Sequence, residues 1–178
     1  MIMARLPSID EREHPELAGV VAEINALRPG RERLSPLYRV LLNSPSFTQA
    51  WLHFLTAVRM QMSIPAMYRE LVLVRVAMLN GAQYEYREHV PLALAAGFSR
   101  EQIDALADWS GSNVFDESQR AVLAYIDAMT REISVPDDIF AGVREIFTDR
   151  QLVELTGMIA TFNFVSRFLV ALEIEHDH

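Results

Sequence analysis

A glutamate and a histidine, four residues apart, are the pair in this sequence best suited to acid–base chemistry. Asn80-Gly81 predicts a tight turn between two apolar helical segments, so Glu85 falls in the first turn of a new helix and His89 lies one turn further along the same face. The helix macrodipole favours a carboxylate at such a position. A carboxylate beside an imidazole can fix the ring's tautomer and give a general acid/base that works near neutral pH. The spacing alone is also typical of a surface ion pair without a catalytic role.

The residue types that are absent exclude several kinds of catalysis. The chain has no cysteine, which removes thiolate nucleophiles, disulfides and thiolate metal sites. All 16 basic side chains are arginine, which excludes a lysine Schiff base and covalently bound pyridoxal phosphate. Glu85 and His89 supply only two of the three or four ligands that a metal site needs. The sequence therefore predicts no metal and no organic cofactor.

Charge balance and the amino-terminal segment narrow the choice of partners. The formal net charge of -8 argues against a nucleic-acid surface. Residues 1–7 lack the apolar stretch of a signal peptide, and no uncharged run approaches the roughly 18 residues that span a bilayer. We therefore expect a cytoplasmic protein with a small-molecule substrate, no nucleic-acid partner and no membrane association.

Proline, glycine and small polar residues are placed as in an all-α chain, and we expect residues 1–178 to form one domain. Helix N-caps are predicted at residues that precede proline or lie three residues before glutamine, namely Ser35, Ser44, Ser99, Asp116 and Thr148. Helix ends are predicted at Gly30, Gly97 and Gly111. The resulting helices span roughly residues 15–28, 35–42, 45–62, 65–80, 82–96, 99–109, 116–133, 136–146 and 149–175.

The last predicted helix is apolar on two faces. One face carries Leu152, Leu155, Ile159, Phe162, Ser166 and Leu169, and the other carries Met158, Val165, Phe168 and Leu172. A helix of this kind must be buried on both faces, so it either crosses the middle of the domain or is covered on one side by another subunit. Arg167 interrupts the pattern. If it is buried it needs an anion, either a structural salt-bridge partner or a substrate carboxylate.

Four positions within residues 69–107 form a recognisable pattern. Glu70 precedes Ala82 and Glu85, which are three residues apart, and His89 follows four residues later. The pattern resembles the core motif of the carboxymuconolactone decarboxylase and alkylhydroperoxidase D-like family, whose peroxidase members carry Cys-x-x-Cys-x-x-x-His after an upstream glutamate. Ala82 and Glu85 occupy the two cysteine positions, so this chain resembles a member without the redox cysteines.

The resemblance implies a fold of eight or nine helices and a homo-oligomer, trimeric or hexameric and at least dimeric. Tyr84-Glu85 in place of a cysteine is more similar to the decarboxylase branch. The first hypothesis is a cofactor-independent lyase or isomerase that acts on a small carboxylated, lactone or carbonyl substrate. His89 would donate the proton, Glu85 would orient it, and Glu70 would be an outer carboxylate or relay. Tyr84 and Arg167 would contact the substrate.

Two other hypotheses stay open. A non-catalytic small-molecule-binding or assembly protein could keep the fold after losing the cysteines, and a buried Glu85–His89 pair without an adjoining cavity would favour it. An alkylhydroperoxidase-like antioxidant protein that reduces peroxide without cysteine would suit the family name but has no thiol to oxidise. His53, near Trp51 on an amphipathic helix, is expected to be a core or interface histidine.

Overall fold

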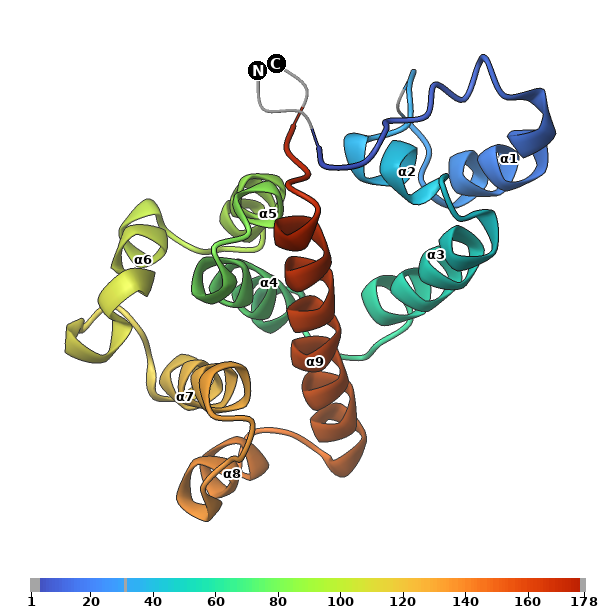
Figure 1. The fold of residues 1–178 in the computed structure, drawn as a ribbon. Helices are drawn as coiled ribbons and strands as arrows, with labels where there is room; N and C mark the ends of the chain where they lie inside the picture. The colour runs from blue at the N-terminus through green and yellow to red at the C-terminus, as the bar shows by residue number, and fades with distance from the viewer. Residues whose placement is uncertain (1–3, 31, 177–178) are drawn as a thin grey trace. The chain divides into compact units, whose positions relative to one another are not determined.

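The computed structural model describes residues 4–30 and 32–176, and every regular element within them is a helix (Figure 1). In chain order the elements are η1 (Pro15–Leu17), α1 (Ala18–Leu27), α2 (Pro36–Leu41), α3 (Pro45–Met60), α4 (Ala66–Asn80), α5 (Gln83–Ala95), α6 (Arg100–Ala105), η2 (Leu106–Gly111), α7 (Glu117–Arg131), α8 (Asp137–Arg144) and α9 (Asp149–Ala171). The all-α prediction is confirmed. The expectations for the amino terminus fall partly on residues 1–3, which lie outside the described residues.

Most predicted helix boundaries hold to within a few residues, and three differ for local reasons. The predicted helix 99–109 divides into α6 and η2, because Asp108 leaves helical geometry at φ -129 and ψ 55. The last helix ends at Ala171 rather than near residue 175, and Glu173 then adopts a positive φ of 52. The predicted helix 15–28 begins with the 3-10 turn η1.

Side-chain capping follows the sequence prediction in part. Reciprocal capping boxes join Ser99 to Gln102, Asp116 to Gln119 and Thr148 to Gln151. Each satisfies two backbone groups that a helix start leaves unpaired. Ser35 and Ser44 stand at the predicted N-cap positions before proline, although neither side chain makes a cap hydrogen bond. Their helices begin through the fixed φ of proline at the first position.

The described chain forms two compact units. The first holds residues 4–61 together with 168–176, and its helices are α1, α2 and α3 with the end of α9. In this unit the ring of Trp51 lies 4.9 Å from that of Phe168, centroid to centroid, and the backbone N–H of Arg5 donates to the carbonyl of Leu172. These contacts attach the two ends of the chain to one another.

The second unit, Met62–Arg167, contains the glutamates and the histidine selected from the sequence. Its α4 lies among α5, α7 and α9 (Figure 1). Every residue of α4 from Glu70 to Ala77 is buried. A helix enclosed on all sides holds its polar residues in a fixed place, because each turn is packed by neighbours.

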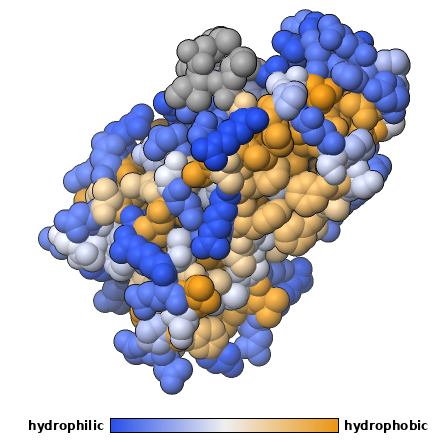
Figure 2. Space-filling model, in the orientation of Figure 1, coloured by the Kyte–Doolittle hydropathy of each residue, from blue (hydrophilic) through white to orange (hydrophobic). Residues whose placement is uncertain are grey.

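Helix α9 (Asp149–Ala171) is the longest helix in the described part of the chain. The first predicted face is buried along its whole length, from Leu152 at 5% exposed to Leu169 at 1%, and Met158 and Val165 of the second face are also buried. By length and composition α9 could cross a membrane, yet half of its most apolar stretch is buried inside the fold, as expected of a core helix. Apolar side chains also reach the surface, as the orange areas of Figure 2 show.

Candidate functional site

The turn between α4 and α5 fixes where the candidate site begins. Gly81 adopts a left-handed conformation with φ 67, which glycine reaches without the strain of a side chain. The backbone N–H of Ala82 donates to the carbonyl of Ala77 at 2.9 Å, closing a Schellman-type helix end. Asn80 reaches back to the carbonyl of Val76. The predicted tight turn at Asn80-Gly81 is confirmed, and α5 therefore folds back beside α4.

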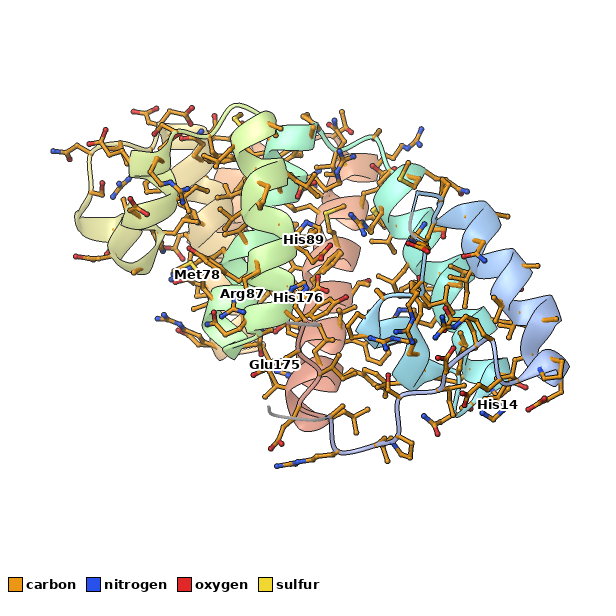
Figure 3. All side chains as sticks on the ribbon, turned by 90° about the horizontal axis from the view of Figure 1, so that it is seen from above. His14, Met78, Arg87, His89, Glu175 and His176 are labelled. Carbon is orange, nitrogen blue, oxygen red and sulfur yellow. The ribbon has the colours of Figure 1, made fainter. Side chains whose placement is uncertain are left out.

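Glu70, Glu85 and His89 come together in one buried cluster. His89 Nδ1 lies 2.8 Å from Glu70 Oε2, and His89 Nε2 lies 3.5 Å from Glu85 Oε2. The side chains of the three residues are 7%, 8% and 3% exposed, in the order Glu70, Glu85 and His89. Figure 3 shows His89 on α5 in the space toward α9. A surface ion pair, the alternative reading of the i,i+4 spacing, is therefore ruled out by burial.

The two carboxylates do not have equal parts in holding the imidazole. An ionised carboxylate only accepts hydrogen bonds, so with Glu70 ionised the short contact requires a hydrogen on His89 Nδ1. The 3.5 Å separation from Glu85 exceeds the usual length of such a bond. Glu70 is therefore the carboxylate that orients the ring. The sequence prediction assigned the orienting role to Glu85, because the i,i+4 spacing places it beside His89. Spacing along one helix cannot show that Glu70, on another helix, lies nearer to the imidazole.

The cluster carries more negative charge than one histidine can balance. Two carboxylates flank a single imidazole, which brings one positive charge when protonated. The guanidinium of Arg69 lies with Nε 3.5 Å from Glu70 Oε1, and its side chain is 29% exposed. Arg69 thus brings a second positive charge from the partly exposed edge of the cluster. With His89 protonated the four formal charges sum to zero, and the loss of one proton leaves an anion.

An aromatic ring packs on the imidazole of the cluster, and a buried tyrosine precedes Glu85 in the chain. The ring of Phe162, on α9, meets that of His89 edge to face with centroids 6.0 Å apart. Tyr84, in the first turn of α5, is buried at 6% exposed. Surroundings of this kind exclude water and strengthen electrostatic interactions within them. Phe162 was expected only as a core residue, since no sequence signal shows which residue of α9 faces α5.

Arg167 and His53 are both exposed in this structure. Arg167 lies on the exposed side of α9, so the burial that would have required an anion is not present. Contact between Arg167 and a substrate stays a prediction. His53 is a surface residue rather than a core residue: its side chain is 61% exposed and its Nε2 lies 2.6 Å from Glu23 Oε1. Its helix α3 is amphipathic as expected, but His53 falls on the polar side.

Within the described ranges, no group of three or more histidine, cysteine, aspartate or glutamate side chains is arranged to hold a metal ion. In the cluster itself the imidazole lies between the carboxylates and bonds to one of them. Such an arrangement moves or holds a proton, since the contacting groups are an acid and its bases.

Comparisons with known proteins agree with this motif. Residues 45–128 match the carboxymuconolactone decarboxylase family. An uncharacterized Bacillus subtilis protein, YdfG, is 29% identical over 114 residues, which are 63% of this chain and 78% of that protein.

Solved structures agree as well. A putative antioxidant defence protein AhpD of unknown function, from Agrobacterium tumefaciens, is 28% identical and covers 76% of this chain and 94% of its own, with a TM-score of 0.71. The match to an AhpD-core, peroxidase-related protein from Ralstonia eutropha covers 99% of this chain and 94% of that protein, with a TM-score of 0.81. At 16% identity it supports the fold alone. The chain is therefore similar to the carboxymuconolactone decarboxylase family over residues 45–128 and to AhpD-like proteins in its fold, and it has no cysteine.

Proposed function

We propose that this protein is a cofactor-independent lyase or isomerase of the carboxymuconolactone decarboxylase type, and that its substrate is a small carboxylated lactone or ketone. The observation that carries the proposal is the position of His89 between two buried carboxylates, 2.8 Å from Glu70 and 3.5 Å from Glu85. Two buried acidic groups beside one imidazole are the kind of arrangement that shifts proton affinities at acid–base sites, and Arg69 offsets the second negative charge only from a partly exposed position.

The proposed reaction is a decarboxylation followed by protonation of carbon. The bond between the carboxylate and the neighbouring carbon breaks, carbon dioxide leaves, and the electron pair moves through the conjugated system onto the lactone or ketone oxygen as an enolate. The His89 imidazolium then gives a proton to the carbon, and the carbonyl re-forms. His89 takes a new proton from solvent, so the overall reaction consumes one proton and releases carbon dioxide. An isomerase would use the same group to protonate one carbon after a neighbouring carbon has lost a proton.

The two glutamates have separate roles in this proposal. Glu70 accepts the hydrogen bond from His89 Nδ1 and so leaves Nε2 as the atom that delivers the proton. Glu85, beside Nε2, stabilises the imidazolium by charge and can receive the proton that returns. Tyr84 is buried next to Glu85 and is retained as a proposed substrate contact.

Thiol-dependent peroxidase chemistry does not apply to this chain, because it has no cysteine to form a sulfenate or a disulfide. We predict no hydroperoxide consumption when the purified protein is coupled to a dithiol reductant. Steady turnover in that assay, lost on substitution of His89, would contradict the prediction and favour a cysteine-independent antioxidant activity.

A second function has one observation in its favour. None of the three side chains in the cluster is more than 8% exposed, as expected if the fold keeps the pair as a structural remnant in a non-catalytic binding or assembly protein. The two proposals differ in what the loss of His89 does. A structural remnant loses stability, whereas a catalytic cluster loses turnover.

The test is a screen of ring-cleavage lactone acids and β-keto acids, with released carbon dioxide and product mass as the readouts. We expect turnover of at least one compound, with no added metal or cofactor, and its loss in His89→Ala. His53→Ala is the matched control, because it removes an imidazole that is 61% exposed and belongs to the other unit. Equal activity in wild type and His89→Ala would refute the proposal.

We also propose that the protein acts as a homo-oligomer. The side of α9 that the fold leaves open carries Val153 at 74% exposed and Phe164 at 42%, with Ala160 exposed between them. These positions share one helical stripe, and an exposed apolar stripe is typical of subunit contacts. Light scattering at micromolar concentration should give a mass that is a multiple of 20.2 kDa. A monomer would contradict the proposal, and Val153→Arg should shift the mass downward if this stripe is the contact.

A further inference from the structure

Ser166 is a buried hydroxyl that the fold does not use. The residue is 1% exposed, and its Oγ has no hydrogen-bond partner within residues 4–30 and 32–176. Two threonines earlier in the same helix behave differently. Thr156 and Thr161 each donate to the backbone carbonyl four residues before them, at 2.7 and 2.6 Å. A serine in a helix can make the same bond, and Ser166 does not make it to Phe162.

The side of α9 that carries Ser166 faces α5 and the end of α4. Phe162 packs its ring on His89, and Asn163 Oδ1 accepts a hydrogen bond from Asn80 at 3.0 Å. At about 100° per residue, Ser166 lies between these two residues in helical projection, about 40° from Phe162 and about 60° from Asn163. The serine therefore points into the sector of α9 that the candidate site borders.

Helix directions bring Ser166 level with Glu85. Ser63, just before α4, bonds to Glu154, and Asn80 at the end of α4 bonds to Asn163, so α4 and α9 run in the same direction. The turn at Gly81 reverses the chain, so α5 runs opposite to both.

One helical turn back from His89 along α5 leads to Glu85, and one turn forward from Phe162 along α9 leads to Ser166. Both steps are four residues, or about 6 Å. Because His89 contacts Phe162, Glu85 and Ser166 therefore lie at about the same height along the two antiparallel helices.

We propose that the Ser166 hydroxyl is a catalytic hydrogen-bond donor that binds the lactone or ketone oxygen of the substrate and stabilises the enolate formed there. The inference rests on the proposed function. That reaction places negative charge on an oxygen, and neither Glu70 nor Glu85 can stabilise it while ionised, because both carry the same sign of charge. A neutral hydroxyl with no partner in the fold can donate to it without first breaking another bond.

The proposal also narrows the substrate. An oxygen bound by Ser166 while His89 delivers a proton requires a carbonyl or lactone oxygen one or two bonds from the carbon that is protonated. β-Keto acids and unsaturated lactone acids satisfy this requirement. Simple carboxylic acids without such an oxygen do not, and we expect no turnover of them.

The experiment compares Ser166→Ala with Thr161→Val in the full-length protein. Thr161→Val is the matched control, since it removes a buried hydroxyl from the same helix that is already bonded within the helix. We expect Ser166→Ala to lower kcat by about 10²-fold with little change in KM, because the donor acts on charge that develops in the transition state. Thr161→Val should keep wild-type kcat.

Stability separates this role from a structural one. Removal of a buried hydroxyl that has no partner should leave the melting temperature of Ser166→Ala equal to that of wild type or above it. A clear fall in melting temperature together with unchanged kcat would show that Ser166 serves packing alone, and would overturn the inference.

The outcomes also separate this inference from the proposed function. If His89→Ala abolishes turnover and Ser166→Ala does not change it, the inference fails and the proposed function stands. If His89→Ala is fully active, the proposed function fails. A crystal structure of the ligand-free protein gives a readout that needs no substrate. We expect Ser166 Oγ to bind a water that also contacts Glu85 or His89, and a bond from Oγ to the Phe162 carbonyl would contradict this.

Discussion

Two buried clusters of charge in the Met62–Arg167 unit differ in how they are balanced. In the first, Arg75 donates through Nε and Nη2 to both oxygens of Asp127 at 2.7 and 2.6 Å, and through Nη1 to the carbonyl of Leu106 at 2.7 Å. Trp109 adds a further donor to Asp127. Arg75 and Asp127 pair in bidentate geometry, which is the arrangement that buried ion pairs need, and the exposed Arg131 approaches the same carboxylate at 3.9 Å.

The second cluster has the opposite character. Two carboxylates share one imidazole, only one of the contacts is short, and a partly exposed arginine supplies the remaining charge. The first cluster ties α4 to α7 and η2. In the second cluster the net charge depends on one proton. We therefore expect the first cluster to support stability and the second, which is the more deeply buried of the two, to handle a proton.

The largest effect that separates the clusters should come from His89→Ala. On the substrate found in the screen we expect turnover to fall by at least about 10³-fold, since the proton donor is lost. The protein should remain folded, as measured by circular dichroism and by its melting temperature. An unfolded His89→Ala protein would place this cluster in the same class as Arg75 and Asp127, and would remove the contrast.

The reverse pattern is expected at the first cluster. Asp127→Ala leaves the guanidinium of Arg75, whose side chain is 4% exposed, without its carboxylate, and should lower the free energy of unfolding by about 3–5 kcal/mol. Urea denaturation measures this loss. The specific activity of the folded fraction should be unchanged.

A double variant sharpens that test. Arg75→Met combined with Asp127→Leu removes both charges, and should recover most of the stability that Asp127→Ala loses. If the double variant is as unstable as the single one, the pair supports the fold through more than its charges. If Asp127→Ala abolishes turnover in fully folded protein, the first cluster also serves function and the comparison breaks.

Smaller effects should rank the two glutamates. Glu70→Gln keeps the size of the side chain but removes the charged acceptor at Nδ1, and we expect it to lower kcat by roughly 10²–10⁴-fold. Glu85→Gln, at the longer contact, should cost about tenfold. Each glutamate variant combined with His89→Ala should be little worse than His89→Ala alone, because residues that act as a unit are not additive. A larger loss in Glu85→Gln than in Glu70→Gln would restore Glu85 as the orienting residue.

The sequence predicted elements better than it predicted partners. Local signals such as Gly81, the capping box at Ser99 and the burial of Leu155 and Ile159 were correct, because each depends on residues a few positions apart. The resemblance also pointed to Glu70, Glu85 and His89 together, and the structure places these three side chains in one cluster.

What the sequence could not supply was the arrangement of one helix against another. Glu70 is 19 residues from His89, and only the packing of α4 against α5 makes it the nearer carboxylate. The same reason explains why Phe162 and Ser166 could be assigned to an apolar face but not to a site. The sequence also left the burial of Arg167 open, and His53 is exposed rather than part of the core, because a single residue on an amphipathic helix can still face solvent.

The most direct test of the account is the tautomer of His89, which needs no substrate. In protein labelled with ¹⁵N at histidine, and with the His89 signals assigned by comparison with His89→Ala, we expect Nδ1 to carry a hydrogen in wild type. In Glu70→Gln the side-chain amide can donate to Nδ1 instead, so we expect a shift toward the tautomer with hydrogen on Nε2. A neutral wild-type ring with hydrogen on Nε2 alone, unchanged in Glu70→Gln, would contradict the central claim that Glu70 orients His89 for proton delivery.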